Sequence, residues 1–183
     1  MILRDLFLFL SKFVTRDALN DFFIPPTAGL YSGPLNDHSM LEANAKAIGD
    51  TDRIPFLTAI IFGIDEESIR QRISSVQGGF LFVEYSAITS YINQYDTKID
   101  KMHVGITVAS PLPDDSPQDN QLIVMDNSLE AIRTIRGALR ADYEIGKIWL
   151  PMEASTLTPF HSKALANSYG WTLELNAELI DLV

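Results

Sequence analysis

The chain has 183 residues, 46% of them apolar and 21% charged, which is enough to build one hydrophobic core. Its 14 basic and 24 acidic residues give a formal charge of −10, which disfavours general electrostatic binding of nucleic-acid phosphates. The sequence has no cysteine, which excludes disulfides, thiolate metal sites and cysteine nucleophiles. The composition therefore predicts a single domain over residues 1–183, with no specific nucleic-acid binding.

Apolar residues recur at helical spacing over 1–14, among them Leu3 and Phe7, and predict a helix that packs on the core. Leu8 and Phe9 widen its apolar surface, so we expect a neighbouring subunit to cover part of it through Leu3, Phe7 and Phe9. The polar side lacks the basic excess of a membrane-surface helix. The unbroken apolar run is too short for a signal peptide or a membrane span, which predicts a cytoplasmic protein without membrane contact.

The region 22–52 contains many turn-forming residues and little periodicity, and is predicted to be a long surface excursion. Loops of this length are usually functional or docked on a partner. A near-continuous apolar run over 54–64 predicts a buried strand, and 65–76 predicts a short helix with Asp65 as its cap. Aromatic and β-branched residues over 80–87 favour a central strand.

The segment 89–100 is compatible with a hairpin or with a short helix. Alternating apolar residues over 101–110 predict a strand. Prolines and acidic residues then concentrate over 111–120, which predicts an exposed, mobile loop. A well-marked helix should follow, with Asn127 as its N-cap and Glu130 three residues later, as in a capping box.

Two strand patterns follow this helix. Residues 148–152 are apolar but contain Pro151, which favours an edge strand or a bulge. Residues 169–179 alternate apolar with polar side chains, as a long amphipathic strand does. The order of elements predicts an α+β domain with a mostly antiparallel sheet and helices packed on one side.

The sequence contains no arrangement typical of catalysis, cofactor binding or metal binding. His38, His103 and His161 lie far apart, and no second histidine stands at helical spacing from any of them. Glycine-rich phosphate-binding motifs are absent. We therefore expect no catalytic residues, no cofactor and no metal. An alternative stays open: an enzyme or small-molecule binding module with a pocket under 22–52 and His38 or Asp37 at its mouth.

Arg133, Arg136 and Arg140 are spaced to share one face of the predicted helix. In an acidic chain this stripe is either a solvated face with nearby carboxylates or a contact with an acidic face of another subunit. We take the three arginines, together with the apolar residues of the N-terminal helix, as the candidate subunit interface. A further alternative is an adaptor whose acidic surface covers a basic partner protein.

The second half of the chain resembles the tail-terminator and tail-completion proteins of long-tailed phages and prophages. The resemblance rests on the strand KMHVGITV (101–108), the helix SLEAIRTIRGAL (128–139) after a polar loop, and the final YGWTLEL (169–175). It implies a non-enzymatic homo-oligomer that forms a closed ring, commonly hexameric, where the tail tube meets the head. The chain would then be cytoplasmic during assembly and part of the virion tail afterwards, with other tail or head-completion proteins as partners. The stretch 22–52 departs from this pattern and leaves a different tail or baseplate role open.

Overall fold

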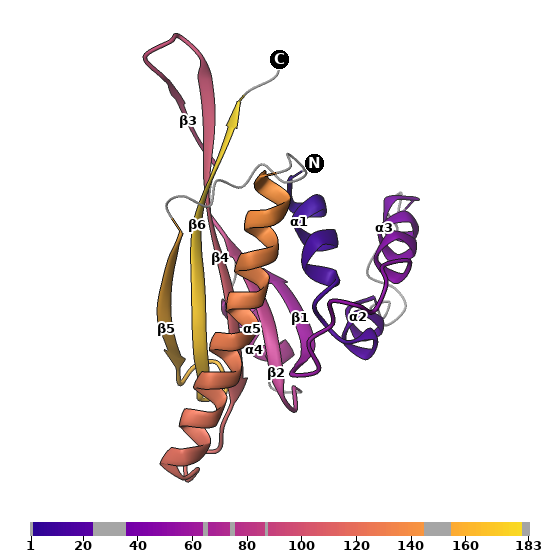
Figure 1. Ribbon diagram of the computed structural model, residues 1–183, viewed down its shortest axis with the longest axis vertical. Coiled ribbons are helices and arrows are strands. Elements are labelled where there is room, and N and C mark those ends of the chain that lie inside the picture. Colours follow the sequence, from indigo (N-terminus) through magenta and orange to yellow (C-terminus); the bar gives the residue numbers. More distant parts are fainter. Residues whose placement is uncertain are drawn as a thin grey trace.

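The computed structural model describes residues 2–23, 36–63, 66–73, 76–86, 88–144 and 155–180. Its helices are α1 (Ile2–Ser11), α2 (Arg16–Phe22), α3 (Asn36–Lys46), α4 (Glu66–Ile73) and α5 (Gln118–Glu144). Its strands are β1 (Leu57–Gly63), β2 (Gly79–Tyr85), β3 (Thr89–Ile92), β4 (Lys98–Pro111), β5 (Thr156–Ser162) and β6 (Ser168–Ile180). The predicted α+β class is confirmed (Figure 1).

The strands form one sheet in the order β1-β2-β4-β6-β5, with β3 paired to β4. β1 and β2 are parallel, and the other pairs of the described sheet are antiparallel, which confirms the mostly antiparallel arrangement. β4 pairs with β6 from Ile99, opposite Ile180, to Pro111, opposite Ser168. This long pairing makes β4 and β6 the centre of the sheet.

Two hydrophobic clusters lie on opposite faces of the sheet, because successive side chains of a strand point to opposite sides. Leu81 and Val83 of β2 join the larger cluster with α1 and α5, whereas Phe80 and Phe82 join the smaller cluster with α4. In Figure 1, α5 lies in front of the sheet and α4 behind it. The helices therefore cover both faces and not one side alone, since β2 is apolar on both.

Several predicted boundaries change. α5 begins at Gln118, so Asn127 lies inside the helix and the prediction that it caps the helix is wrong. β4 runs through Pro111, which leaves 112–117 as the loop within the predicted 111–120 stretch. None of the residues 118–127 is fully buried, so the apolar periodicity does not reveal these first turns of α5.

The predicted excursion over 22–52 contains the helix α3, and its residues 24–35 lie outside the described residues. The predicted cap Asp65 and the predicted strand 148–152 also lie outside them. The segment 89–100, for which two conformations stayed open, forms a hairpin between β3 and β4. β5, which pairs with the lower part of β6, was not predicted.

Candidate functional site

The structure buries two of the three residues that were predicted to make a subunit contact through α1. Phe7 and Phe9 are buried in the chain's own core, so their assignment to a subunit interface is wrong. The ring of Phe7 lies 4.6 Å from that of Phe22 and 5.4 Å from that of Phe62, between centroids, because α2 and β1 close over it. Leu3 is partly buried against the same cluster. Periodicity finds the apolar face of a helix, but it does not show which part of the chain covers that face.

The three arginines of the predicted interface lie along α5. Arg133 and Arg140 are exposed, and Arg136 is half-buried beside the face that packs on the sheet through Ile135. Arg140 Nε donates to Glu144 Oε1 at 3.0 Å, one helical turn away. Exposed pairs of this kind contribute little to stability. Most of this stripe is therefore accessible to a partner.

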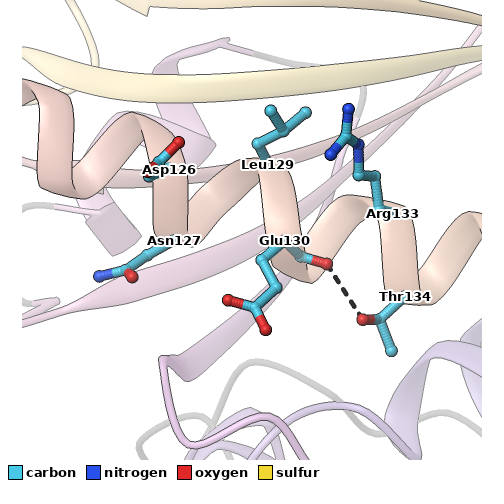
Figure 2. A pocket seen from close by; sticks show the side chains of 6 residues that line it. All are labelled: Asp126, Asn127, Leu129, Glu130, Arg133 and Thr134. Carbon is cyan, nitrogen blue, oxygen red and sulfur yellow. Dashed lines mark hydrogen bonds between the residues drawn. The ribbon is translucent and has the colours of Figure 1, made fainter.

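An open depression of about 550 Å³ lies along the same helix, lined by Asp126, Asn127, Leu129, Glu130, Arg133 and Thr134. Figure 2 shows Leu129 and Arg133 extending from one side of α5, and Glu130 and Thr134 from another. Thr134 Oγ1 donates to the Glu130 carbonyl at 3.0 Å, so this hydroxyl is bonded within the helix. The lining presents mixed charge and one apolar side chain, a character that suits a protein surface contact.

The histidines are not brought together by the fold. His103 is exposed on β4, and His161 stacks on Tyr169 at 4.3 Å between ring centroids at the end of β5. The side chain of His38 lies outside the described residues, as does that of Asp37, so the alternative pocket under 22–52 stays a prediction. Across the described ranges, no group of three or more histidine, aspartate and glutamate side chains is placed to hold a metal ion.

One end of the sheet projects from the body of the molecule. The β3–β4 hairpin, residues 88–101, and the end of β6 extend past the described helices, and we call these strands the arm (Figure 1). Every residue of β3 is exposed. Ile92 is 67% exposed and Tyr95 78%, and Ile88 and Tyr91 add further exposed apolar surface. Sequence reasoning missed the arm as a functional feature.

Polar groups close the turn of the arm. The Asn93 side-chain oxygen accepts from the backbone N–H groups of Tyr95 at 2.9 Å and Thr97 at 3.0 Å. Asp96 takes a left-handed backbone conformation with φ of 59°, which an aspartate tolerates better than most residues. Ser90 bonds to Asp100 across the two strands. Local polar contacts define the hairpin, and Ile88, Ile92 and Tyr95 remain exposed on it.

A second exposed apolar site lies near the start of α5. Leu122 is 71% exposed and Ile123 56%, and they precede Asp126, the first residue that lines the depression, by four and three residues. Single apolar residues are normal on a protein surface. Two large apolar residues that are adjacent in the sequence, on the helix that also carries the three arginines, make this side of α5 a candidate contact surface. The arm and the solvent-exposed side of α5 are thus the two candidate contact surfaces.

Comparisons with known proteins give no match among family models, curated proteins or solved structures. Within the part of the chain that the structure describes, none of the helices combines the length and the apolar character needed to cross a bilayer.

Proposed function

We propose that this chain is a non-enzymatic structural subunit of a phage or phage-derived tail, and that its copies assemble into a ring at the end of the tail tube. The observation that carries the proposal is the arm, which holds exposed Ile88, Tyr91, Ile92 and Tyr95 beyond the helices. The second half of the chain has the order strand, loop, helix and strand. This order resembles that of tail-terminator proteins and supports a role in a tail.

The arm is poorly suited to stand alone in water. A two-stranded hairpin alone is at best marginally stable in water, and it gains stability from further strands or from a helix that covers an apolar face. Covering apolar surface yields roughly 25 cal/mol for each Å² removed from water. The exposed isoleucines and tyrosines would therefore gain from docking on another copy, and each copy would present its own arm in turn.

Charge favours a contact between copies at this place. The whole chain carries −10, so two copies repel each other over most of their surfaces. Within the hairpin 88–101, Lys98 and Lys101 balance Asp96 and Asp100. Copies can therefore approach through the arm with little electrostatic repulsion.

An arm that docks on the body of the next copy makes a head-to-tail contact, because the two contacting surfaces differ. Contacts of this type close into rings when the rotation between neighbours divides a full turn. The proposed ring belongs to a virion tail after assembly in the cytoplasm, with other tail or head-completion proteins as its neighbours. Ring size follows from the rotation angle and is not fixed by the chain alone.

Sedimentation velocity of the full chain tests the proposal. We expect a single large oligomer at micromolar concentration, and dissociation to smaller species when Ile92→Ser and Tyr95→Ser are combined, since both remove apolar contact area from the arm. Met40→Ser is the matched control, because Met40 is a large exposed apolar residue on α3, 56% exposed and remote from the arm. A chain that sediments as a monomer at every concentration, or an oligomer that the arm variant leaves intact, would contradict the proposal.

A further inference from the structure

β3 leaves one edge of the arm open. It pairs with β4 over its whole length, from Thr89 opposite Lys101 to Ile92 opposite Lys98, and none of the other described strands pairs with it (Figure 1). All four residues of β3 are exposed. The open edge of a strand presents a row of backbone N–H and C=O groups, which can bond to a strand of another chain.

The turn of the hairpin determines which backbone groups of β3 face the open edge. Hydrogen-bonded and non-hydrogen-bonded pairs alternate along two antiparallel strands. The N–H of Asn93 donates to the carbonyl of Thr97 at 2.9 Å, so these two residues form a hydrogen-bonded pair. Two residues earlier, Tyr91 therefore bonds to β4. The N–H and C=O groups of Ser90 and Ile92 point the other way, to the open edge.

The other edges of the described sheet carry features that oppose pairing with a further strand. β5 has Pro159 in its middle, and proline has no N–H to donate. At the start of β1, the Leu57 carbonyl already accepts from the N–H of Thr15 at 3.0 Å. Beyond its pairing with β5, β6 contains Glu178, and a charge at an edge disfavours pairing. β3, with the sequence TSYI, contains neither a proline nor a charged residue.

We propose that β3 pairs edge to edge with β3 of a second copy, antiparallel and about a two-fold axis that passes between the two Tyr91 residues. Ser90 of each copy then lies opposite Ile92 of the other. Each of these residues offers one N–H and one C=O, so the two residues of each copy form four backbone hydrogen bonds between the copies. A register centred on Ser90 or on Ile92 aligns the other residue with a position outside β3.

The side chains agree with the same register. Residues that pair across neighbouring strands lie on the same face of a sheet, so Ile99 and Tyr91 of one copy continue into Tyr91 and Ile99 of the second copy as one apolar row. The two tyrosines form a non-hydrogen-bonded pair, in which side chains approach most closely. Tyr91 is 42% exposed in the single chain and gains burial from this contact. Because β3 matches itself in backbone groups and in side chains, a second copy is the partner that fits it.

This pair goes beyond the ring proposed above and does not depend on it. The pair uses the backbone edge of β3, whereas the ring uses apolar side chains of the arm. Ile92 lies on the opposite face of β3 from Tyr91, so pairing leaves it available to the ring contact. A two-fold contact joins two copies, or two rings that face each other. Its loss therefore halves the mass of the assembly in either case.

Proline at position 90 gives the most direct test. Ser90→Pro removes the outward N–H but leaves the backbone bonds between β3 and β4 in place, because Ser90 does not bond to β4 through its backbone. Ser90→Ala is the matched control, since it also loses the side-chain bond to Asp100 and keeps the N–H. In sedimentation equilibrium we expect Ser90→Pro to pair at least about tenfold more weakly, with half the native mass, and Ser90→Ala to keep the native mass. Thermal unfolding of dilute samples checks that both variants are folded.

The absence of cysteine in the chain allows the register to be measured. Tyr91→Cys places the two thiols beside the two-fold axis, with Cα atoms about 4.5 Å apart, so this variant should form a disulfide between copies under mild oxidation. Thr89→Cys is the control in the same strand. Thr89 lies opposite Asn93 of the second copy, which leaves the two thiols about 13 Å apart along the strands, and no cross-link should form.

Three results would overturn the inference: a native chain that is monomeric, a Ser90→Pro variant that keeps the native mass, or a Tyr91→Cys variant that cross-links no more than Thr89→Cys does. If Ser90→Pro keeps the native mass and the combined Ile92→Ser and Tyr95→Ser variant loses it, the ring stands without the pair. If the chain forms only dimers, and Ser90→Pro converts them to monomers, the pair stands without the ring.

Discussion

At the scale of single residues, Arg53 connects segments that are distant in the sequence. Its guanidinium donates to the carbonyl of Val14, to that of Ser11 at 3.4 Å and to that of Ile48 at 3.5 Å, and the side chain is only 10% exposed. The last carbonyls of a helix have no partner inside it, so Arg53 supplies donors where α1 ends. This junction places α2 and α3 relative to the core.

Replacing Arg53 with lysine keeps the charge but removes the planar set of donors. We expect Arg53→Lys to lower the free energy of unfolding by about 2 kcal/mol, because nearly buried carbonyls lose their partners. Arg16→Lys is the control: Arg16 contacts Asp50 at 2.9 Å but is half exposed, and its loss should cost less than about 1 kcal/mol. Urea denaturation measures both. Equal effects of the two substitutions would contradict the role assigned to Arg53.

The carboxylate of Asp50 makes this junction sensitive to acid. Hydrogen bonds from Arg53 and then from Arg16 hold the pKa of Asp50 below its ordinary value. A carboxyl whose pKa is lower in the folded state stabilises the fold above its unfolded pKa, and this contribution disappears as the pH falls through the lowered value. The stability difference between the native chain and Asp50→Asn should therefore be constant near neutral pH and shrink in acid. Denaturation in a pH series measures it, and a difference that grows in acid would contradict this account.

At the scale of elements, β4 and β6 approach so closely that one position in β6 has no room for a side chain. Gly170 pairs with Ala109, and a Cβ there would overlap the Val108 carbonyl oxygen and lie 2.6 Å from the Ala109 Cα. The strands would have to separate to accept any other residue. The long β4–β6 pairing that supports the arm depends on this glycine.

We expect Gly170→Ala to destabilise the protein by about 2 kcal/mol or more, as overpacking in a core does. Gly105→Ala is the matched control in the neighbouring strand, because a Cβ at Gly105 would lie 3.8 Å from both Glu84 and Thr172, at ordinary contact distance. Thermal or urea unfolding compares them. A Gly170→Ala variant as stable as the control would show that the strands tolerate separation.

The elements also show how far the sequence predicts the fold. The strands over β4 and β6 follow from their alternating apolar residues, and the second half of α5 from its buried stripe. The start of α5 does not follow from the sequence, because none of the residues 118–127 is buried. β5 does not follow from it either, because Pro159 and polar residues are not typical of a strand, and the strand is defined by its pairing with β6. Such elements depend on tertiary contacts and not on their own pattern.

The sequence likewise predicts one part of the candidate site and not the rest. The arginine stripe on α5 follows from residue spacing, since helical geometry alone puts Arg133 and Arg140 on one side. The burial of Phe7 does not, because α2 and β1 close over it from other parts of the chain. The arm was not predictable as a projecting feature, since a hairpin is a local property and its distance from the helices is a property of the whole fold.

At the scale of the whole molecule, the sheet connects two surfaces of different character. The arm at one end carries exposed apolar side chains, and the solvent-facing side of α5 carries both acidic and basic residues. Six copies in a ring would together carry about −60, so a lumen that shares this charge would repel DNA and let it pass without binding. Contacts between neutral or complementary surfaces would hold such an acidic ring together. Its lumen would still not bind DNA.

Electron microscopy of phage tails assembled with the full chain tests the central claim most directly. The tails should carry a ring of the gold-labelled chain at one end of the tube, and tails made with the Ile92→Ser and Tyr95→Ser variant should lack it, while Met40→Ser tails keep it. Tubes that end identically with and without the chain, or label that never lies at a tube end, would contradict the account.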